Sequence, residues 1–254
     1  MVCPVLAADG SVTTVRLYVD HPLGAGQTVP LSRTQAHYLF TVMRLRRGGH
    51  VTVFNGRDGA WQAEITQAAR NAGALDCVEM VAPQGHPPDL WLLFAPIKKA
   101  RTDFIVEKAT EMGVRRILPV RTDFTNSERL RRDRLQAHAI EAAEQCGGTF
   151  VPELCELTPL SDVLQGWDPA RRLMFCDETR AGTHDPLPRM EPGAAPDPWA
   201  VLIGPEGGFS PAERARLAAL DVAQPVALGP RVLRADTAAV AALTLWQITF
   251  GDWR

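Results

Sequence analysis

The chain has 254 residues, of which 46% are hydrophobic and 22% are charged, and it carries a formal net charge of −2 at pH 7. This is the composition of an ordinary globular protein with one large domain or two smaller ones. No apolar run approaches the length of a membrane span, and the first residues lack the basic region and long apolar core of a secretory signal. We therefore expect a cytoplasmic protein with no membrane partner.

Cysteine and histidine spacing argues against a metal site. The five cysteines, an odd number, form no C-x-x-C pair, and the six histidines show no H-E-x-x-H spacing. A disulfide framework and a zinc site are both disfavoured. We expect free thiols in a reducing compartment and no bound metal.

Short strands dominate the sequence from residue 16 to 82, after residues 1–15, which we expect to form an N-terminal extension that can be disordered. One helix interrupts them: Ser32 is a good N-cap, and apolar residues then recur at helical spacing. The turn residues Asn55-Gly56-Arg57-Asp58-Gly59 predict a hairpin. Several short strands around one helix indicate a small β-barrel, with strands expected at 15–19, 50–54, 60–65 and 74–81.

Three arginines, Arg44, Arg46 and Arg47, follow this helix as a basic cluster. A solvated surface is the simpler interpretation, because charged side chains ordinarily face water. Arginine and lysine also supply most of the phosphate contacts in complexes with nucleic acids. The cluster is therefore a candidate RNA-binding edge.

Residues 83–89 are rich in proline and predict a linker between two domains, 16–82 and 90–254. Beyond the linker, apolar strands alternate with helices. This alternation predicts a largely parallel α/β sheet with helices on both faces, and ligand sites in such sheets lie at the carboxyl ends of the strands. The expected strands are 90–95, 116–120, 172–176, 200–203 and 225–228, and the expected helices are 101–112, 132–146 and 237–250.

Lys98, Lys99 and Arg101 form a basic turn just after the first of these strands. The simple interpretation is that they keep the start of a helix soluble. They also fall on the ligand side of the predicted sheet, and for that reason we slightly favour contact with RNA phosphates.

Two glycine-containing loops follow the strands at 200–203 and 225–228. The first leads into a helix for which Ser210 is the N-cap and Glu213 completes a capping box. Its glycines do not fit G-x-G-x-x-G, and the chain has no G-x-x-x-x-G-K-[ST], which excludes a dinucleotide fingerprint and a P-loop. The last helix is apolar on nearly all sides, so it must be covered by its own domain or by a second subunit.

The two loops carry a resemblance to a known family. GPEGGFSPAE, beginning at Gly204, and LGPRVLRADTAAVAAL, beginning at Leu228, resemble the SPOUT superfamily of knotted RNA methyltransferases. Within it they resemble the bacterial 16S ribosomal RNA (uracil-N3)-methyltransferase family. Residues 37–65 resemble the family's N-terminal PUA-like RNA-binding domain, and the segments KATEMGV and EQCG match in order. Asp236 stands where the family usually has Glu, and Gly148 where it commonly has Arg.

This resemblance implies a fold class, a cofactor and partners. The fold is α/β: a C-terminal knotted SPOUT methyltransferase domain with a largely parallel sheet, preceded by a small PUA-like β-barrel. The cofactor is S-adenosylmethionine (SAM). The substrate is 16S rRNA within an assembled or assembling small ribosomal subunit, and the enzyme is a homodimer. Backbone groups and glycines that would hold the cofactor lie at Ile203, Gly204, Gly207, Gly208, Leu228, Gly229, Val232, Leu233 and Thr237.

The implied reaction assigns roles to the charged candidates. Uridine N3 is a weak acid, so the site must favour loss of its proton and stabilise the resulting negative charge. Arginine offers a permanently charged planar fork, and Arg234 is the leading candidate, with Arg231 second. Asp236 or Glu206 could take the proton or hold the arginine, but Asp236 could equally be a helix N-cap before Thr237.

Two other functions stay open on this evidence. One is a SPOUT methyltransferase that acts on another RNA position, such as a ribose 2′-OH. The other is a non-catalytic RNA-binding dimer. In either methyltransferase the target base is inaccessible inside a duplex, so it must be splayed out to reach the pocket.

Overall fold

The computed structural model describes residues 15–126, 129–183 and 197–253. The predicted extension, residues 1–15, lies outside this range except for Val15. The chain divides into two compact units, one formed by residues 1–86 and 143–151 and the other by residues 87–142 and 152–254. Within the part that the structure describes, no helix is long and apolar enough to cross a membrane.

The first unit is built on one five-stranded sheet with the order β1-β3-β4-β5-β2. The predicted hairpin is present, because β3 and β4 pair antiparallel, while β1 joins β3 in parallel. The core is made of fully buried aliphatic side chains that include Val29, Val53 and Ile65. The elements are β1 (Arg16–Tyr18), β2 (Thr28–Leu31), α1 (Arg33–His37), η1 (Tyr38–Val42), β3 (His50–Phe54), β4 (Ala60–Ala69) and β5 (Ala72–Ala82).

The predicted helix of this unit is two short elements. Ser32 caps α1 as expected, and Gln35 reaches back to complete a capping box. The helix then widens into the π-helical turn η1, which has Met43 as its C-cap. The next residue, Arg44, has a φ of 57°. Glycine or asparagine usually occupies such a left-handed position, because other side chains are strained there. The basic cluster therefore begins at a strained helix end.

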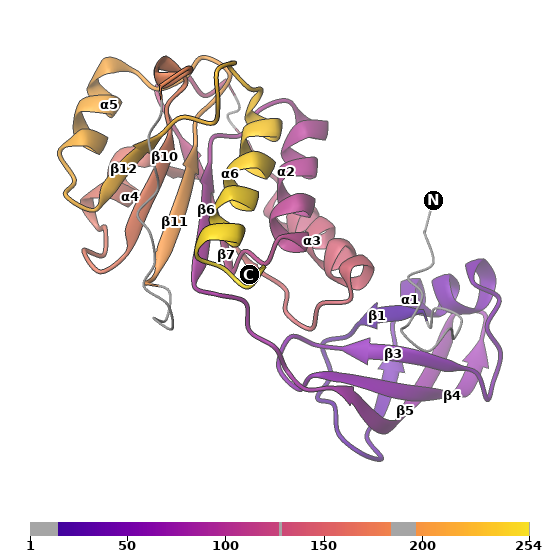
Figure 1. Cartoon of the computed structure of the whole chain (residues 1–254). Helices are drawn as coiled ribbons and strands as arrows, with labels where there is room; N and C mark the ends of the chain where they lie inside the picture. Colours follow the sequence, from indigo (N-terminus) through magenta and orange to yellow (C-terminus); the bar gives the residue numbers. More distant parts are fainter. Residues whose placement is uncertain (1–14, 127–128, 184–196, 254) are drawn as a thin grey trace. The chain divides into compact units, whose positions relative to one another are not determined.

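The second unit is a parallel α/β sheet with the order β12-β10-β11-β6-β7-β8, and β9 pairs with β7 (Figure 1). All of its strand pairs are parallel, as predicted. The elements are β6 (Leu90–Phe94), α2 (Lys99–Glu111), β7 (Arg116–Arg121), α3 (Arg132–Cys146), β8 (Glu153–Leu154), β9 (Thr158–Pro159), α4 (Leu160–Gln165), β10 (Arg172–Cys176), η2 (Glu178–Arg180), β11 (Trp199–Ile203), α5 (Pro211–Ala218), β12 (Ala223–Val226) and α6 (Ala235–Thr249).

Helices cover both faces of this sheet. Leu160 of α4 and Leu217 of α5 join one buried cluster with side chains of the strands. Figure 1 shows α2, α3 and α6 on the other side of the sheet, where α2 and α6 pack together. The strand order reverses between β6 and its neighbour β11, which creates a topological switch point at their carboxyl ends.

Several predicted boundaries are wrong by a few residues. The strand expected at 60–65 is β4 and continues to Ala69, and the helix expected from Arg101 is α2 and begins at Lys99. The strand expected at 225–228 is β12 and ends at Val226, so Leu228 lies in the following loop. The helix expected from Thr237 begins two residues earlier, with Arg234 as its N-cap. The helix after Ser210 is as expected, because Ser210 and Glu213 form the predicted capping box.

A buried arginine holds the amino ends of three strands together. Arg171 is almost fully buried, and its Nη1 donates to the carbonyls of Asp89 and Trp199, while Nη2 pairs with Asp89 Oδ2 at 2.8 Å. Its guanidinium also lies 3.7 Å from the centroid of the Trp91 ring. This end of the sheet is thus closed by packing, and the opposite, carboxyl end carries the loops of the candidate site.

Candidate functional site

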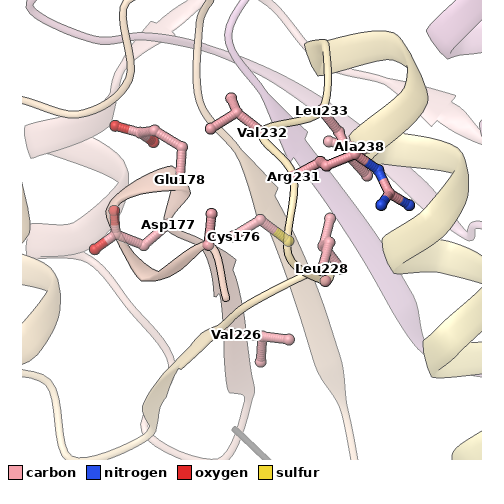
Figure 2. Close-up of a pocket in the computed structure, with 11 residues that line it drawn as sticks. Cys176, Asp177, Glu178, Val226, Leu228, Arg231, Val232, Leu233 and Ala238 are labelled. Carbon is pink, nitrogen blue, oxygen red and sulfur yellow. The ribbon is translucent and has the colours of Figure 1, made fainter. Parts of the chain in front are cut away.

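A pocket opens at the carboxyl ends of β10 and β12. One wall is the turn that follows β10, from Cys176 to Ala181, and the other is the loop from Leu228 to Leu233 (Figure 2). Val226 and Ala238 complete the lining. The pocket holds about 340 Å³ of empty space, part of it open to solvent.

The inner surface of the pocket is mainly apolar side chain and backbone. Asp177 and Glu178 line it, but their carboxylates point away from Leu228 (Figure 2). Both pair instead with Arg214 of α5: Arg214 Nε lies 3.3 Å from Asp177 Oδ1, and Arg214 Nη2 contacts Glu178 Oε1. The pocket therefore offers apolar contacts and main-chain groups to a ligand, a combination that suits a nucleoside better than a phosphate.

The thiol of Cys176 is part of this lining, on the side of Leu228 in Figure 2. Burial raises the pKa of Cys176 to about 12, because a thiolate would lose its hydration there. At neutral pH the group is a neutral, weakly polar thiol. The sequence analysis did not predict a role for Cys176, Asp177 or Glu178. Their place at the carboxyl end of a predicted parallel strand, with Cys176 as its last residue and Asp177 and Glu178 directly after it, was the signal that could have found them.

The loop after β11 supports the pocket from behind. Gly208 has a φ of 70°, and its N–H donates to the carbonyl of Pro205. A Cβ atom at Gly208 would lie 2.0 Å from Glu178 Oε1, so only glycine lets this loop approach the wall. Gly204 and Gly207 are also close to aromatic side chains. A Cβ atom added at Gly204 would lie 3.1 Å from the Phe209 ring, and one added at Gly207 would lie 3.2 Å from the Cβ of Phe124.

The structure brings only some of the predicted cofactor residues to the pocket. Four of the nine line it: Leu228, Gly229, Val232 and Leu233. The remaining five do not, namely Ile203, Gly204, Gly207, Gly208 and Thr237. Gly208 acts on it indirectly through Glu178, and Thr237 is exposed in the first turn of α6.

Both predicted catalytic arginines lie at this edge. Arg231 lines the pocket, and Arg234 is exposed at the N-cap of α6. Asp236 is not the helix cap that we considered, because the cap position is Arg234 and α6 has no side-chain cap. Its Oδ1 accepts a hydrogen bond from the N–H of Thr237 inside the first turn.

Arg101 differs from the expectation of an RNA contact. Its Nη1 lies 3.5 Å from Asp236 Oδ1 and 3.9 Å from Glu206 Oε1, so it stands between both predicted catalytic carboxylates. Lys98 and Lys99, the other members of that basic turn, are exposed. Arg44, Arg46 and Arg47 are exposed in the first unit. Among the described residues, no group of three or more His, Cys, Asp and Glu side chains could hold a metal ion.

Two family profiles match the chain. The profile of the RNA methyltransferase domain matches residues 84–247, and that of the RNA methyltransferase PUA domain matches residues 31–74. A Synechocystis protein named ribosomal RNA small subunit methyltransferase E is 30% identical, over 93% of this chain and 78% of its own length. The protein of that name from Rickettsia conorii is 27% identical, over 90% of this chain and 93% of its own length.

Solved structures are similar over nearly the whole chain. The ribosomal RNA small subunit methyltransferase E of Neisseria gonorrhoeae, bound to SAM, has a TM-score of 0.84 and 26% identity, covering 95% of this chain and all of that one. A putative methyltransferase of Legionella pneumophila in complex with SAM has a TM-score of 0.80 and 27% identity, covering 94% of this chain and 99% of its own. These matches confirm the predicted fold class.

Proposed function

The chain belongs to the RNA methyltransferase family that contains the ribosomal RNA small subunit methyltransferases E, and on that premise we propose that it methylates N3 of one uridine in 16S rRNA. The chain is a SAM-dependent methyltransferase of small-subunit rRNA. The choice of uridine N3 as the acceptor atom is the part that we propose. The observation that carries it is the carboxyl edge of the sheet. There Arg231 lines a mainly apolar pocket, Arg234 is exposed at the N-cap of α6, and Arg101 lies between the carboxylates of Asp236 and Glu206.

The lining of the pocket supports its assignment to SAM. Val226, Leu228 and Leu233 offer apolar contact to an adenine ring, and the backbone around Gly229 can hydrogen-bond its edge. Gly229 has a φ of 107°. A Cβ atom added at this residue would have no heavy atom within 4 Å, so there is open space beside this turn. When bound there, SAM supplies a methyl group that is already activated by its sulfonium sulfur. We assign the pocket, with Gly208 behind it, to the cofactor.

The chain's own residues must then prepare the acceptor. Uridine N3 becomes nucleophilic when its proton is lost, and the negative charge then spreads over the ring oxygens. We assign stabilisation of this charge to Arg234, with Arg231 as the second candidate, because a guanidinium is always charged and donates from a planar fork. We assign the N3 proton to the carboxylate of Asp236, with Glu206 as the alternative acceptor.

RNA binding is assigned to surfaces of both units. In the first unit Arg44, Arg46 and Arg47 are exposed and free to approach phosphates. In the second unit Lys98 and Lys99 are exposed at the ligand edge of the sheet. We propose that each of these surfaces contacts rRNA of an assembled or assembling small subunit, from which the target base is splayed out. Such a substrate implies a cytoplasmic enzyme.

A homodimer is the proposed assembly. Helix α6 is mainly apolar, and its outward face includes Ile248, which is 54% exposed. A second copy of the chain would cover this face by two-fold symmetry.

The assignment of the pocket is tested by calorimetry with SAM on the Gly208→Val variant. A valine at a φ of 70° is strained, and its Cβ would push into Glu178, so we expect SAM binding to be lost while the circular dichroism spectrum of the fold is kept. Gly166→Ala is the matched control, since the new Cβ would have an ordinary contact at 3.9 Å, and we expect wild-type affinity. Wild-type SAM affinity in a folded Gly208→Val protein would remove the loop from the site.

The acceptor atom is tested by incubating the enzyme with SAM and small ribosomal subunits, followed by mass spectrometry of the nucleosides. We expect N3-methyluridine. A 2′-O-methylated nucleoside, which also protects the adjacent phosphodiester from alkali, would support the ribose alternative. RNA binding without any SAM binding would support the non-catalytic alternative.

A further inference from the structure

Arg101 occupies the centre of the charged cluster at the switch point of the sheet. It lies in the first turn of α2, directly after β6, while Glu206 follows the neighbouring strand β11 and Asp236 opens α6. Three segments that are distant in the sequence therefore meet at one guanidinium. In parallel sheets of this kind the ligand lies at the switch point, outside the carboxyl ends of the strands.

The environment of Arg101 is unusual for a structural ion pair. Its side chain is 28% exposed, but Nη1 is buried and has no hydrogen-bond partner among the described residues. The two carboxylate oxygens are 3.5 and 3.9 Å from Nη1, which is within the range of an ion pair but longer than an ordinary charged hydrogen bond. Nη1 thus attracts both oxygens without making a close contact with either.

Helix stability does not account for Arg101 at this position. The first turn of α2 has no acidic residue, and Lys98, at the N-cap, makes no capping bond. Lys98, Lys99 and Arg101 place three positive charges at the positive end of the helix dipole, where positive charge is disfavoured. Where a local preference is violated in this way, a functional reason is expected.

We infer that Arg101 is a positioning residue for the proposed reaction, and that it orients the Asp236 carboxylate to accept the N3 proton of the target uridine. The inference rests on the proposed function. Asp236 is mostly buried, with 20% of its side chain exposed, whereas Glu206 is 52% exposed. The partly buried carboxylate is the one that a fixed cation can hold in a single orientation. Glu206, on a glycine loop, completes the cluster from the solvent side.

A direct RNA contact by Arg101 is the competing interpretation. The exposed Lys98 and Lys99 are better placed for phosphates, because a phosphate must reach the cation from solvent and Arg101 Nη1 is covered. The two interpretations predict different kinetics. A phosphate contact contributes to substrate binding and so to KM, whereas a positioning residue contributes to kcat.

The test measures kcat, KM for small subunits and SAM affinity for Arg101→Ala and Arg101→Lys. For Arg101→Ala we expect kcat to fall about a hundredfold, the typical effect of a misplaced reacting group, with KM and SAM affinity within about threefold of wild type. Arg101→Lys should have a kcat about tenfold higher than that of Arg101→Ala. Both carboxylates face a single nitrogen, Nη1, so the single ammonium of a lysine can partly replace the guanidinium.

Two controls remove charge from the same helix. Lys99→Ala should raise KM and leave kcat nearly unchanged, because we assign Lys99 to RNA. Lys108→Ala, whose ammonium pairs with Glu111 one turn away, should leave both constants unchanged. If Arg101→Ala behaves like Lys99→Ala, Arg101 is an RNA contact and the inference is wrong.

A double variant identifies the group through which Arg101 acts. If it acts through Asp236, Arg101→Ala combined with Asp236→Asn should lose no more activity than Asp236→Asn alone. Fully multiplicative losses would show that the two residues act independently and would overturn the inference. A wild-type enzyme that fails to methylate small subunits at all would instead contradict the proposed function, so the two failures can be told apart.

Discussion

Arg44 shows how one residue can combine backbone strain with function. Among the described residues other than glycine, it alone has a positive φ, and it begins the proposed RNA-binding cluster. Strain of this kind is retained when the side chain is needed, and it costs of the order of 1 kcal/mol. Substitutions at Arg44 can therefore change the stability of the fold and the affinity for RNA independently of each other.

Replacing Arg44 by glycine should raise the free energy of unfolding by about 1 kcal/mol and weaken RNA binding, because the strain and the charge are removed together. Arg44→Ala is the matched variant: it removes the charge but keeps the strain, so binding should weaken without a gain in stability. Urea unfolding and a filter-binding assay at several salt concentrations measure the two effects. Equal stabilities of the glycine and alanine variants would show that the position is not strained.

Cys176 predicts a pH dependence of stability. Burial raises its folded pKa from 9.0 to about 12, so between these values the unfolded chain loses a proton that the folded chain keeps. The free energy of unfolding should therefore decrease as pH rises from about 9 towards 12, and this contribution should be fully present below pH 9. Urea midpoints measured between pH 8 and 11 should fall more steeply for the wild type than for Cys176→Ala. Parallel curves would contradict burial of the thiol.

At the scale of elements, Gln247 links α6 to α2 and to the end of the chain. It is fully buried, its Nε2 donates to the carbonyl of Met112 at 2.6 Å, and its Oε1 accepts from the N–H of Asp252. Gly251 packs against it so closely that a Cβ atom would lie 1.8 Å from Oε1. A hydrophobic helix is thus held in register by one satisfied polar side chain.

Gln247→Leu should lower the free energy of unfolding by about 1–3 kcal/mol, because the buried Met112 carbonyl and the N–H of the exposed Asp252 would lose their partner. Gln145→Leu, the same exchange on an exposed surface of α3, should change stability by less than about 0.5 kcal/mol. Chemical denaturation of both variants provides the comparison. A neutral Gln247→Leu would mean that water or a backbone shift satisfies these groups.

At the scale of the whole molecule, the outward face of α6 predicts association. If Ile248 lies in a two-fold interface, Ile248→Glu places two like charges against each other there and should convert the dimer to a monomer. Ala218→Glu, on an exposed position of α5, is the control and should leave the mass unchanged. Light scattering at micromolar concentration gives the masses. A wild-type protein that is monomeric and active would contradict the proposed dimer.

Much of the architecture could be predicted because it depends on local signals. The hairpin around Asn55–Gly59, the capping boxes at Ser32 and Ser210, and the alternation that gives a parallel sheet all depend on neighbouring residues and on periodicity. The elements that were missed are short, with four residues in β2, six in α4 and two each in β8 and β9, so they show little periodicity. The pairing of β8 and β9 with β7 is decided by tertiary contacts alone.

The fold class, the two glycine loops and the residue types of the site could be inferred from the sequence, since the family motifs are contiguous. The tertiary fold was needed to show which of these residues meet. It joined Arg101 to Asp236 and Glu206, and it paired the carboxylates of Asp177 and Glu178, two residues of the pocket lining, with Arg214. Such pairings depend on the path of the chain and on the order of strands in the sheet, and neither leaves a periodic signal in the sequence.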